Sequence, residues 1–444
     1  MSNSVVSGRG VGGGRAVWTM VAKSAVLGLV LLAAGCTGTR GSLTEPSATE
    51  PKQDKSLVEA VEFEDKPLWS LSAGNDTAGE DSGLEELSYA ELANDAVVYV
   101  GSDPESRDSS MVVAELDSGE KRWDTTEDEQ IGDSPITPDL QVDDPQLIDD
   151  GKTVIVAYIE PLGSGDGAEE RGVAALSVAN GKLLWNVTVD SNEGYGSHFN
   201  LTDATDTQVL TEVWTTTEED GEDKIDSHRT AVIDVGKRDI AWDKDGVEPQ
   251  GFANDTIVTE RPEVPYPVGE SADQSTVIGY DSAKGEKLWE TDGDKNSTVA
   301  GIAADITAVK VANDITVLDN ATGKNLGDKS IGVDRCRSHE NLLACDSDDK
   351  LGDAAFATIT AANGSAEITS KREFGNLIVH GVFEGRIFLG GNGPDSDQLI
   401  LDAAGNTLAK KTPGLLADIN GDHAIFADRW WSSFDNTIHV YRVE

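Results

Sequence analysis

One short phrase recurs along this chain and constrains its fold more than any other feature. An alternating run of apolar residues is followed by an Asp or small polar residue, a glycine and, four positions later, a tryptophan. Three copies keep this spacing and end at Trp123, Trp185 and Trp289, and a fourth, two residues longer, ends at Trp242. The glycine tolerates the positive φ of a tight turn while the flanking segments alternate between two faces. Each copy therefore predicts strand, turn and strand.

A second hairpin precedes each copy, so the repeating unit has four strands. Residues 89–100, for example, form two β-rich runs on either side of a turn at Asn94-Asp95. Tryptophan or its equivalent falls at positions 69, 123, 185, 242, 289, 327, 368 and 409, which are 38 to 62 residues apart. Four-stranded units at this period are typical of propeller blades. Eight positions predict an all-β, eight-bladed β-propeller. Seven blades is the alternative, because the last three units lack the tryptophan.

The two ends of the repeat region complement each other. Residues 410–444 supply three strands, and residues 66–70 read as an outer strand without the three that should precede it. If this N-terminal strand becomes the outer strand of the last blade, the blade has its four strands, the N-terminal strand has a partner, and the ring closes without an exposed edge. We therefore expect residues 61–444 to form one closed propeller. Five tryptophans are expected to wedge between neighbouring blades as large apolar anchors: Trp69, Trp123, Trp185, Trp242 and Trp289.

The sequence Gly-Lys-Leu-Leu-Trp, ending at Trp185, resembles the outer-strand signature of the quinoprotein-like (PQQ-like) propeller repeat. This family includes the pyrroloquinoline-quinone enzymes and many exported lipoproteins, and the resemblance extends over residues 64–444. It implies a propeller fold. A quinone dehydrogenase of this family would be expected to carry an adjacent Cys-Cys pair over its cofactor. Here Cys336 and Cys345 are nine positions apart, so we do not expect PQQ to bind.

The N-terminus reads as an export signal that ends at a cysteine. Residues 1–35 contain no Asp or Glu, carry three positive charges and run into an apolar stretch too short to span a bilayer. Small residues directly before Cys36 resemble the lipobox of bacterial lipoproteins, and an ordinary secretory signal is the alternative. The resemblance implies a signal peptide over 1–35, starting at Met1 or Met20, and an acylated (palmitate-bearing) Cys36. A flexible tether over 36–60 would then hold the protein on the extracytoplasmic face of the cell membrane.

The chain is strongly acidic, with 35 Lys and Arg against 81 Asp and Glu and a net charge of −46. This charge repels phosphate backbones and excludes nucleic acid as a partner. Long polar loops are predicted between the second and third strands of the early blades, all on one face, at 102–110, 160–171, 215–228 and 261–274. Solubility and mutual repulsion in a highly acidic exported protein are the favoured explanation of this face, and docking of a basic partner or cations is the alternative. The candidate surface residues are acidic side chains and tryptophans outside the blade register: Glu218, Glu219, Asp220, Glu222, Asp223, Trp214, Trp430 and Trp431.

No catalytic constellation stands out in the sequence. The six histidines are dispersed without an i, i+4 helical pair, so no metal site is predicted from them. Neither a Gly-x-Ser-x-Gly elbow nor a phosphate-binding Walker loop occurs. Residues 418–422, with the sequence Asp-Ile-Asn-Gly-Asp, bring oxygen atoms together and make Ca2+ an alternative there. Asn-Gly in a hairpin already explains this segment, and no cofactor is expected.

Cys336 and Cys345 are predicted to form a disulfide. Residues 335–338 and 342–347 read as the first two strands of the sixth blade, joined by a two-residue turn at 340–341. In this register His339 and Leu342 form a hydrogen-bonded pair, and Cys336 faces Cys345 as a non-hydrogen-bonded pair whose side chains approach closely. Such a pair can accept a bridge in an oxidising compartment, and two reduced core cysteines are the alternative.

Together these features favour a lipid-anchored, extracytoplasmic propeller that binds or scaffolds an unknown protein or cell-envelope partner without catalysis. The alternative is a propeller enzyme with a site in the central channel, either a degenerate quinoprotein or a sugar- or peptide-processing protein. Assembly of outer-membrane proteins, the task of one relative with this architecture, is a third hypothesis. Converging carboxylates, Arg or His at the channel mouth would favour the enzyme, whereas an acidic rim over a plain channel would favour binding.

Overall fold

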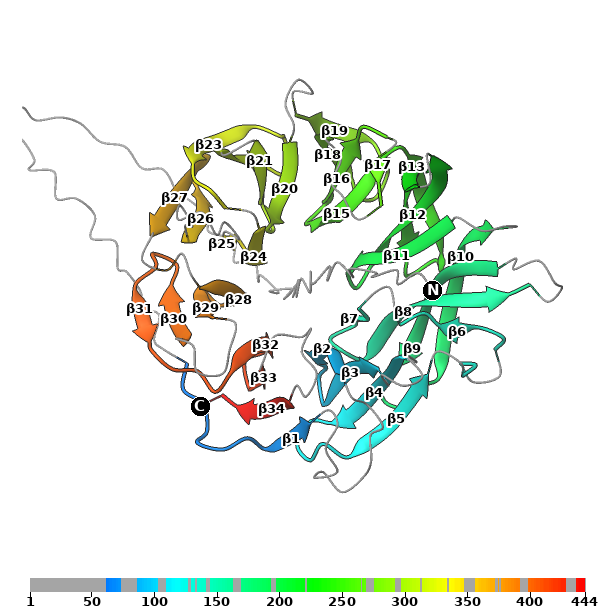
Figure 1. Ribbon diagram of the computed structural model, residues 1–444, viewed down its shortest axis with the longest axis horizontal. Coiled ribbons are helices and arrows are strands. Elements are labelled where there is room, and N and C mark those ends of the chain that lie inside the picture. Colours follow the sequence, from blue (N-terminus) through cyan, green and yellow to red (C-terminus); the bar gives the residue numbers. More distant parts are fainter. Residues whose placement is uncertain are drawn as a thin grey trace, which may run out of the picture.

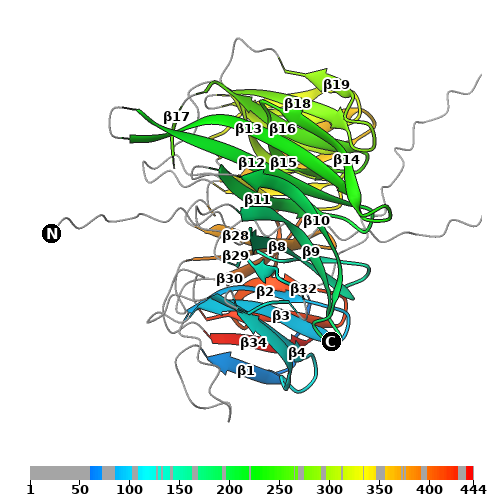
Figure 2. The same cartoon turned by 90° about the vertical axis from the view of Figure 1, so that its right-hand side faces the viewer.

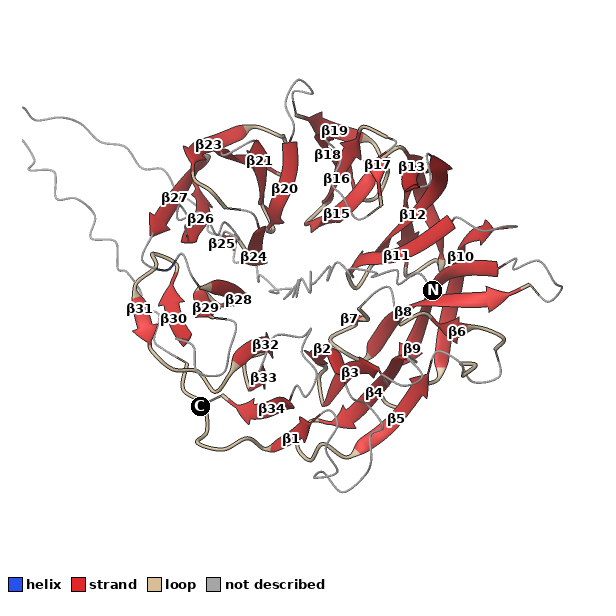
Figure 3. Ribbon diagram, in the orientation of Figure 1, coloured by secondary structure: helices blue, strands red, loops and turns tan. Residues whose placement is uncertain are grey.

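Eight antiparallel sheets are set around a central axis like the blades of a propeller (Figure 1). Every blade is made of strands and loops (Figure 3). The prediction of an all-β, eight-bladed propeller is confirmed, and the seven-bladed alternative is wrong. The computed structural model describes residues 61–72, 86–102, 109–126, 129–131, 134–140, 144–162, 169–192, 197–219, 222–264, 266–268, 275–291, 297–311, 314–333, 335–346, 356–371, 374, 377–391, 398–428 and 437–443.

Blades 1–4 are numbered in chain order, and their strands are given from the inner to the outer edge. Blade 1 contains β2 (Glu86–Leu92), β3 (Ala96–Ser102), β4 (Ser109–Glu115) and β5 (Lys121–Thr126). Blade 2 contains β6 (Thr137–Pro138) and β7 (Gln146–Ile148), which both pair with β8 (Thr153–Pro161), then β9 (Glu169–Ser177) and β10 (Leu183–Asn192). Blade 3 contains β11 (Ser197–Ala204), β12 (Gln208–Glu219), β13 (Glu222–Asp234) and β14 (Asp239–Asp245). Blade 4 contains β15 (Glu248–Ala253), β16 (Thr256–Pro262), β18 (Ser275–Asp281) and β19 (Lys287–Glu290).

Blades 5–8 have the same order but shorter strands on average. Blade 5 contains β20 (Ser297–Ile302), β21 (Ile306–Val311), β22 (Asp314–Asp319) and β23 (Asn325–Ser330). Blade 6 contains β24 (Arg335–His339), β25 (Leu342–Asp346), β26 (Phe356–Ala362) and β27 (Ser365–Lys371). Blade 7 contains β28 (Ile378–Phe383), β29 (Arg386–Gly390), β30 (Gln398–Asp402) and β31 (Thr407–Ala409). Blade 8 contains β32 (Leu415–Ile419), β33 (His423–Ala427), β34 (Thr437–Arg442) and β1 (Trp69–Ser72).

The core is a series of apolar layers between adjacent blades. In β3, Val98 and Val100 pack in the layer shared with blade 2, whereas Val97 and Tyr99 pack in the layer shared with blade 8. Both faces of such a middle strand are buried, and successive residues are therefore apolar. This burial explains why β-branched runs mark the second and third strands of each blade.

The ring closes as predicted, with an N-terminal strand completing the last blade. Trp69 of β1 pairs with Val440 of β34, and an isolated bridge joins Phe63 to Val443 (Figure 1). Because β1 occupies the outer edge of blade 8, segments from the two ends of the chain share one sheet. The closure covers an edge that would otherwise be open to pairing with another chain.

Four of the five predicted wedge tryptophans make one and the same contact with the next blade. The indole Nε1 donates a hydrogen bond of 2.6–2.7 Å to a carbonyl in the turn between the third and fourth strands of that blade. The indole ring packs on the glycine of the same turn. This position has a φ of +67 to +72°, a backbone conformation that favours glycine. The donor and acceptor pairs are Trp69 and Leu116, Trp123 and Val178, Trp242 and Ser282, and Trp289 and Asn320.

Trp185 is the exception, and the sequence shows why. The turn that it would meet belongs to the longer repeat copy, in which Arg238 rather than Gly236 has a positive φ, of 58°. Trp185 instead packs against the apolar layer between blades 2 and 3. Arg238 N–H donates to Asp234 C=O as Gly119 N–H does to Glu115 C=O in blade 1, so an arginine stands in this turn where the other tryptophans meet a glycine.

Candidate binding face

The two faces of the ring are built from different connections. The antiparallel order of each blade places the turns after the first and third strands on one face and the connection after the second strand on the other. On the first face the turns are short, with three residues between β2 and β3 and two between β24 and β25. On the second face six residues separate β3 from β4, seven separate β8 from β9 and twelve separate β16 from β18. We call the second face the long-loop face.

The largest feature of the long-loop face is a hairpin that extends beyond its own blade. β11 pairs with β12 only as far as Thr215, and β14 pairs with β13 only from Arg229 onward. Between these points β12 and β13 continue as a two-stranded ladder to Glu219 and Glu222, and β17 (Tyr266–Pro267) from blade 4 pairs beside Ile225. We call residues 216–219 and 222–228, with β17, the arm (Figure 2).

The sequence-based prediction of a long loop at 215–228 is wrong. Apart from the tip, these residues form strands, because Thr216 and Ile225 pair directly and Thr217 pairs with Lys224. β-branched residues favour this pleated pairing, and the charged residues around them hide the strand pattern in the sequence. The predicted loop at 261–274 likewise contains the strand β17.

A buried chain of three polar side chains fixes the base of the arm. His228 Nδ1 lies 2.6 Å from Glu212 Oε1, and His228 Nε2 lies 3.0 Å from the Tyr266 hydroxyl. The His228 side chain is only 3% exposed and that of Glu212 9%. Charge-assisted hydrogen bonds in such a dry environment are strong, so blade 3 and the connection of blade 4 are held together at this point.

An aromatic stack lies next to this polar chain. Trp214 stacks on His198 with ring centroids 3.8 Å apart, and it also packs against Ile225 and Tyr266 in a small apolar cluster. Burial, helped by the positive charge of Arg171, lowers the pKa of His198, so this ring favours the neutral form that stacks well on an indole. Trp214, predicted as a surface binding residue, is half-buried at the base of the arm.

Two further carboxyl groups are buried beside the Glu212–His228 pair. Burial and, secondarily, the negative charge of Glu212 raise the pKa of Glu248 to about 7. Burial and the charge of Glu248 raise the pKa of Glu260 to about 8, although Glu260 Oε1 accepts a 2.6 Å hydrogen bond from the backbone N–H of Val299. Next to them Asn200 donates to Glu212, and its own Oδ1 is buried without a partner. Blade 4 therefore contains two carboxyl groups whose pKa is raised to near neutral, one close to Glu212 of blade 3 and one hydrogen-bonded to blade 5.

The tip of the arm places like charges opposite each other. Glu218 pairs with Asp223 across the ladder, both side chains are exposed, and Glu219 pairs with Glu222. Directly opposed like charges destabilise a two-stranded ladder. The remaining predicted surface residues, Asp220, Trp430 and Trp431, lie outside the described residues.

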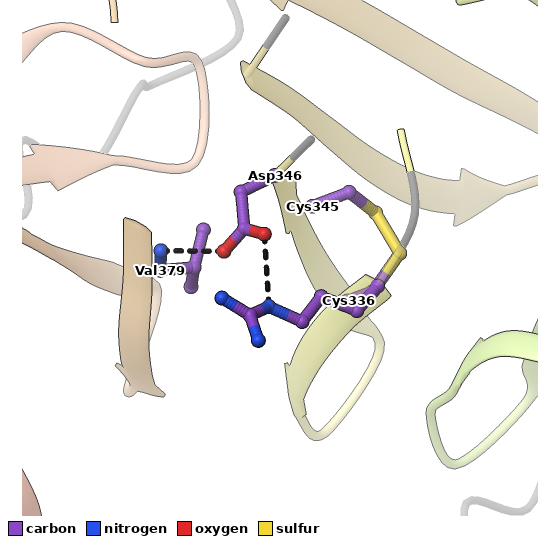
Figure 4. The surroundings of a disulfide bond; sticks show 5 residues. Cys336, Cys345, Asp346 and Val379 are labelled. Atoms are coloured by element: carbon purple, nitrogen blue, oxygen red, sulfur yellow. Dashed lines mark hydrogen bonds and ion pairs between the residues drawn. A yellow bond between two sulfur atoms is a disulfide. The ribbon is translucent and has the colours of Figure 1, made fainter. Parts of the chain in front are cut away.

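The disulfide and its predicted register are both present. Cys336 and Cys345 are directly opposed in β24 and β25 and are joined through their sulfur atoms (Figure 4). On the same pair of strands Arg335 Nε lies 3.0 Å from Asp346, whose other carboxylate oxygen accepts a hydrogen bond of 2.7 Å from Val379 N–H in blade 7. The bridge therefore sits beside a contact between blades 6 and 7.

The inner strands carry buried charges of both signs, which sequence reasoning did not find. In blades 8 and 1, burial raises the pKa of Asp418 to about 6 and, together with the charge of Asp418, that of Glu91 to about 8. In blades 6 and 7, burial lowers the pKa of Arg337 and takes that of His380 to about 4. Single charged residues at strand positions give no signal in the sequence, because their burial depends on neighbouring blades.

The segment considered for Ca2+ has structural hydrogen bonds of its own. Asp418 accepts from the backbone N–H groups of Leu92 and Ile419, and Asn420 Oδ1 accepts from those of Asp422 and His423. Within the described part of the chain, no group of three or more His, Cys, Asp or Glu side chains is arranged to hold a metal ion. Among the same residues, no helix has the length and apolarity needed to cross a membrane.

Comparisons with known proteins find distant structural similarities only. No family model and no curated protein matches the sequence. Among solved structures, BamB from Moraxella catarrhalis is 13% identical, with a TM-score of 0.46, and the match covers 85% of this chain and 97% of that one. A europium-containing methanol dehydrogenase is 11% identical, with a TM-score of 0.48 and coverage of 87% and 94%. The propeller domain of the Trilobed protease from Pyrococcus furiosus is 11% identical, with a TM-score of 0.40 and coverage of 74% and 100%. Similarities this low carry no conclusion about function.

Proposed function

We propose that this chain is a lipid-anchored, extracytoplasmic propeller that binds a partner through its long-loop face and scaffolds it without chemistry. The observation that carries the proposal is the asymmetry between the faces. Short turns build one face, while long connections and the arm build the other. Connections positioned by a rigid scaffold are the usual place of binding residues.

The anchor part of the proposal rests on the sequence before the ring. The charged and apolar segment ending at Cys36 implies lipid attachment, and the residues up to about 60 would act as a tether. If so, Cys36→Ala should move the protein from the membrane fraction into the medium, because no other predicted segment can hold it in lipid. Cell fractionation followed by blotting measures this. Retention of the variant in membranes would refute the anchor and leave the propeller unaffected.

One observation favours a catalytic alternative. The Glu212–His228–Tyr266 chain resembles an acid–base relay in its geometry, and Glu248 beside it has a pKa of about 7. Against an enzyme, His228 and Glu212 are almost fully buried and both nitrogens of the imidazole already have partners. We therefore assign these residues to the support of the arm.

Crosslinking in intact cells tests the binding function. A photoreactive residue at position 217, which is exposed on the arm, should capture one defined partner, whereas one at position 286 on the short-turn face should not. Equal capture from both positions, or none from either, would contradict a face-specific scaffold. Turnover of glycoside or peptide substrates by the purified chain, abolished by His228→Gln, would instead favour the enzyme.

A further inference from the structure

We propose that the arm binds an extended, basic peptide segment of its partner, which adds as a strand along the edge of β12 that no described strand pairs with beyond Thr215. This inference rests on the proposed binding function and assigns to it a surface and a class of ligand. Three features of the arm support it: an unpaired strand edge, a sheet face with mixed apolar and acidic character, and a rigid base.

The unpaired edge is on β12. Its pairing with β11 ends at Thr215, and from Thr216 to Glu219 the strand pairs only with β13 among the described residues. The backbone groups on the side of β12 away from β13 can therefore accept a further strand. An extended peptide added to a sheet edge gains main-chain hydrogen bonds and presents alternate side chains to one face.

The face beside this edge is apolar near the ring and acidic near the tip. Cross-strand pairs point their side chains to one side, so the pair of Glu218 and Asp223 lies on the same face as the pair of Thr216 and Ile225. Ile225 packs with Trp214 and Tyr266. Two residues after Tyr266, Val268 is 44% exposed, and its backbone N–H donates to the backbone carbonyl of Asp223. This face is thus an exposed apolar and acidic strip continuous with a buried cluster.

Charge complementarity identifies the ligand as basic. Glu218 and Asp223 oppose each other and take part in no ion pair among the described residues, so their repulsion is uncompensated in the free protein. A strand with Lys or Arg at alternate positions would place all its charges on this face and remove that repulsion. Acidic or neutral peptide segments would not remove this repulsion. The net charge of −46 on the protein disfavours the binding of acidic segments further.

The base of the arm keeps this surface ordered before binding. The hydrogen bonds of His228 to Glu212 and Tyr266, and the stack of Trp214 on His198, hold the three strands where they leave the ring. A preorganised edge loses less conformational freedom on binding than a flexible loop would. The buried side chains thus act as supports and are not themselves contact residues.

A defined peptide tests this inference on the full chain. The probe is a fluorescent ten-residue peptide of alternating Lys and Val, and its binding is followed by fluorescence anisotropy. We expect Glu218→Lys combined with Asp223→Lys to weaken binding about tenfold or more, because two attractive contacts become repulsive. The matched control combines Glu120→Lys with Glu286→Lys, two exposed carboxylates on the short-turn face, and should change affinity less than about twofold, since only the net charge changes.

Two further peptides separate strand addition from simple charge attraction. A peptide of the same sequence with N-methylated backbone amides should bind at least about tenfold more weakly if main-chain pairing matters. The alternating Glu and Val peptide should not bind. The inference would be overturned if the methylated peptide bound equally well or if the control variant weakened binding equally. It would also be overturned if the unmodified chain did not bind the Lys and Val peptide, which would imply that the acidic residues only protect the edge from aggregation.

Failure of this inference is distinguishable from failure of the proposed function. If the Glu218→Lys and Asp223→Lys chain still crosslinks the same cellular partner with the same yield, the partner binds elsewhere on the long-loop face. The scaffold function then stands and the peptide site on the arm is wrong. Loss of crosslinking in this variant, with retention in the control variant, supports both.

Discussion

The two halves of the ring are joined at their outer edges by different contacts. Between blades 8 and 1, 1 and 2, 3 and 4, and 4 and 5, a tryptophan packs on the glycine turn of the next blade. Between blades 5 and 6 the corresponding Gly364 has no atom within 4 Å of the position of a Cβ. Between blades 6 and 7 the aliphatic chain of Lys371 covers Gly405. The tryptophan contact is therefore not required for a blade to take its place in the ring.

The half without tryptophan has other links near the channel. The disulfide joins the two inner strands of blade 6, and Asp346 next to it accepts a hydrogen bond from the backbone of blade 7. The apolar layers between blades 5, 6 and 7 remain continuous. Inner hydrogen bonds of this kind also occur in the early half, where Phe252 N–H of blade 4 donates to Asp203 of blade 3. We infer that the early half is fastened both at its rim and near its axis and the late half near its axis, and the following experiments test this difference.

The largest effect should come from removing the closing strand. Deletion of residues 61–72 takes away the outer strand of blade 8 and the contact of Trp69 with blade 1. We expect the whole ring to lose more than about 5 kcal/mol of stability, because the loss combines a buried aromatic with an opened sheet edge. Thermal unfolding measures this, with deletion of the tether residues 37–48 as control. An unchanged melting temperature would contradict the role of closure.

The second comparison is between a tryptophan and its counterpart in the late half. Trp289 is 7% exposed, and Trp289→Ala should cost about 3–5 kcal/mol, whereas Ile368→Ala in blade 6 should cost about 1–2 kcal/mol because Ile368 is only partly buried. Denaturant unfolding of both variants gives the two free energies. Equal losses would mean that the rim contacts of the two halves do not differ.

The disulfide should matter less than the tryptophan. Replacing both Cys336 and Cys345 by Ala opens a short loop, so the loss of stability should be about 2–3 kcal/mol at most. Hydrogen exchange should show that the amides of blades 6 and 7 lose protection before those of blades 1–4. Uniform loss around the ring would refute a link that acts on the late half.

The smallest effect is a dependence on pH with opposite signs in the two halves. Glu260 in blade 4 has a raised pKa of about 8. Its carboxyl group therefore keeps in the folded protein a proton that it releases in the unfolded chain above about pH 4–5. The stability of the folded protein consequently falls as the pH rises through about 8. The cost is up to about 1.4 kcal/mol per pH unit in that window. His380 in blade 7 has a lowered pKa of about 4, so its contribution is present above about pH 6.5 and is lost as pH falls toward 4.

Matched variants separate the two limbs of this pH profile. Glu260→Gln should lessen the decline between pH 6 and 8, to which Glu91 with its pKa of about 8 also contributes. His380→Gln should flatten the acid limb only. Chemical unfolding across pH 4–9 measures both, and a profile unchanged by either substitution would contradict the assignment.

Local patterns in the sequence predicted most of the fold. They did not predict the contacts between segments of different blades that build the candidate site. The turn glycines, the alternation and the two incomplete ends gave the blade number, the closure and the pairing of Cys336 with Cys345, because each depends on residues close in sequence or on a repeated spacing. The arm was missed because β17 belongs to another blade, and its pairing with Ile225 has no local signal. Likewise Glu212, His228 and Tyr266 are unremarkable singly and become a unit only when blades 3 and 4 pack together.

The position of β1 has a consequence for the order of folding. β1 is synthesised before every blade, yet its partner β34 follows all the other strands in the chain. Interior blades can pair locally as soon as each hairpin emerges, whereas β1 must wait unpaired until the final blade exists. Closure of the ring therefore waits until all eight blades have been synthesised. A truncated product would keep an open blade and an unpaired strand, both exposed to proteolysis or aggregation.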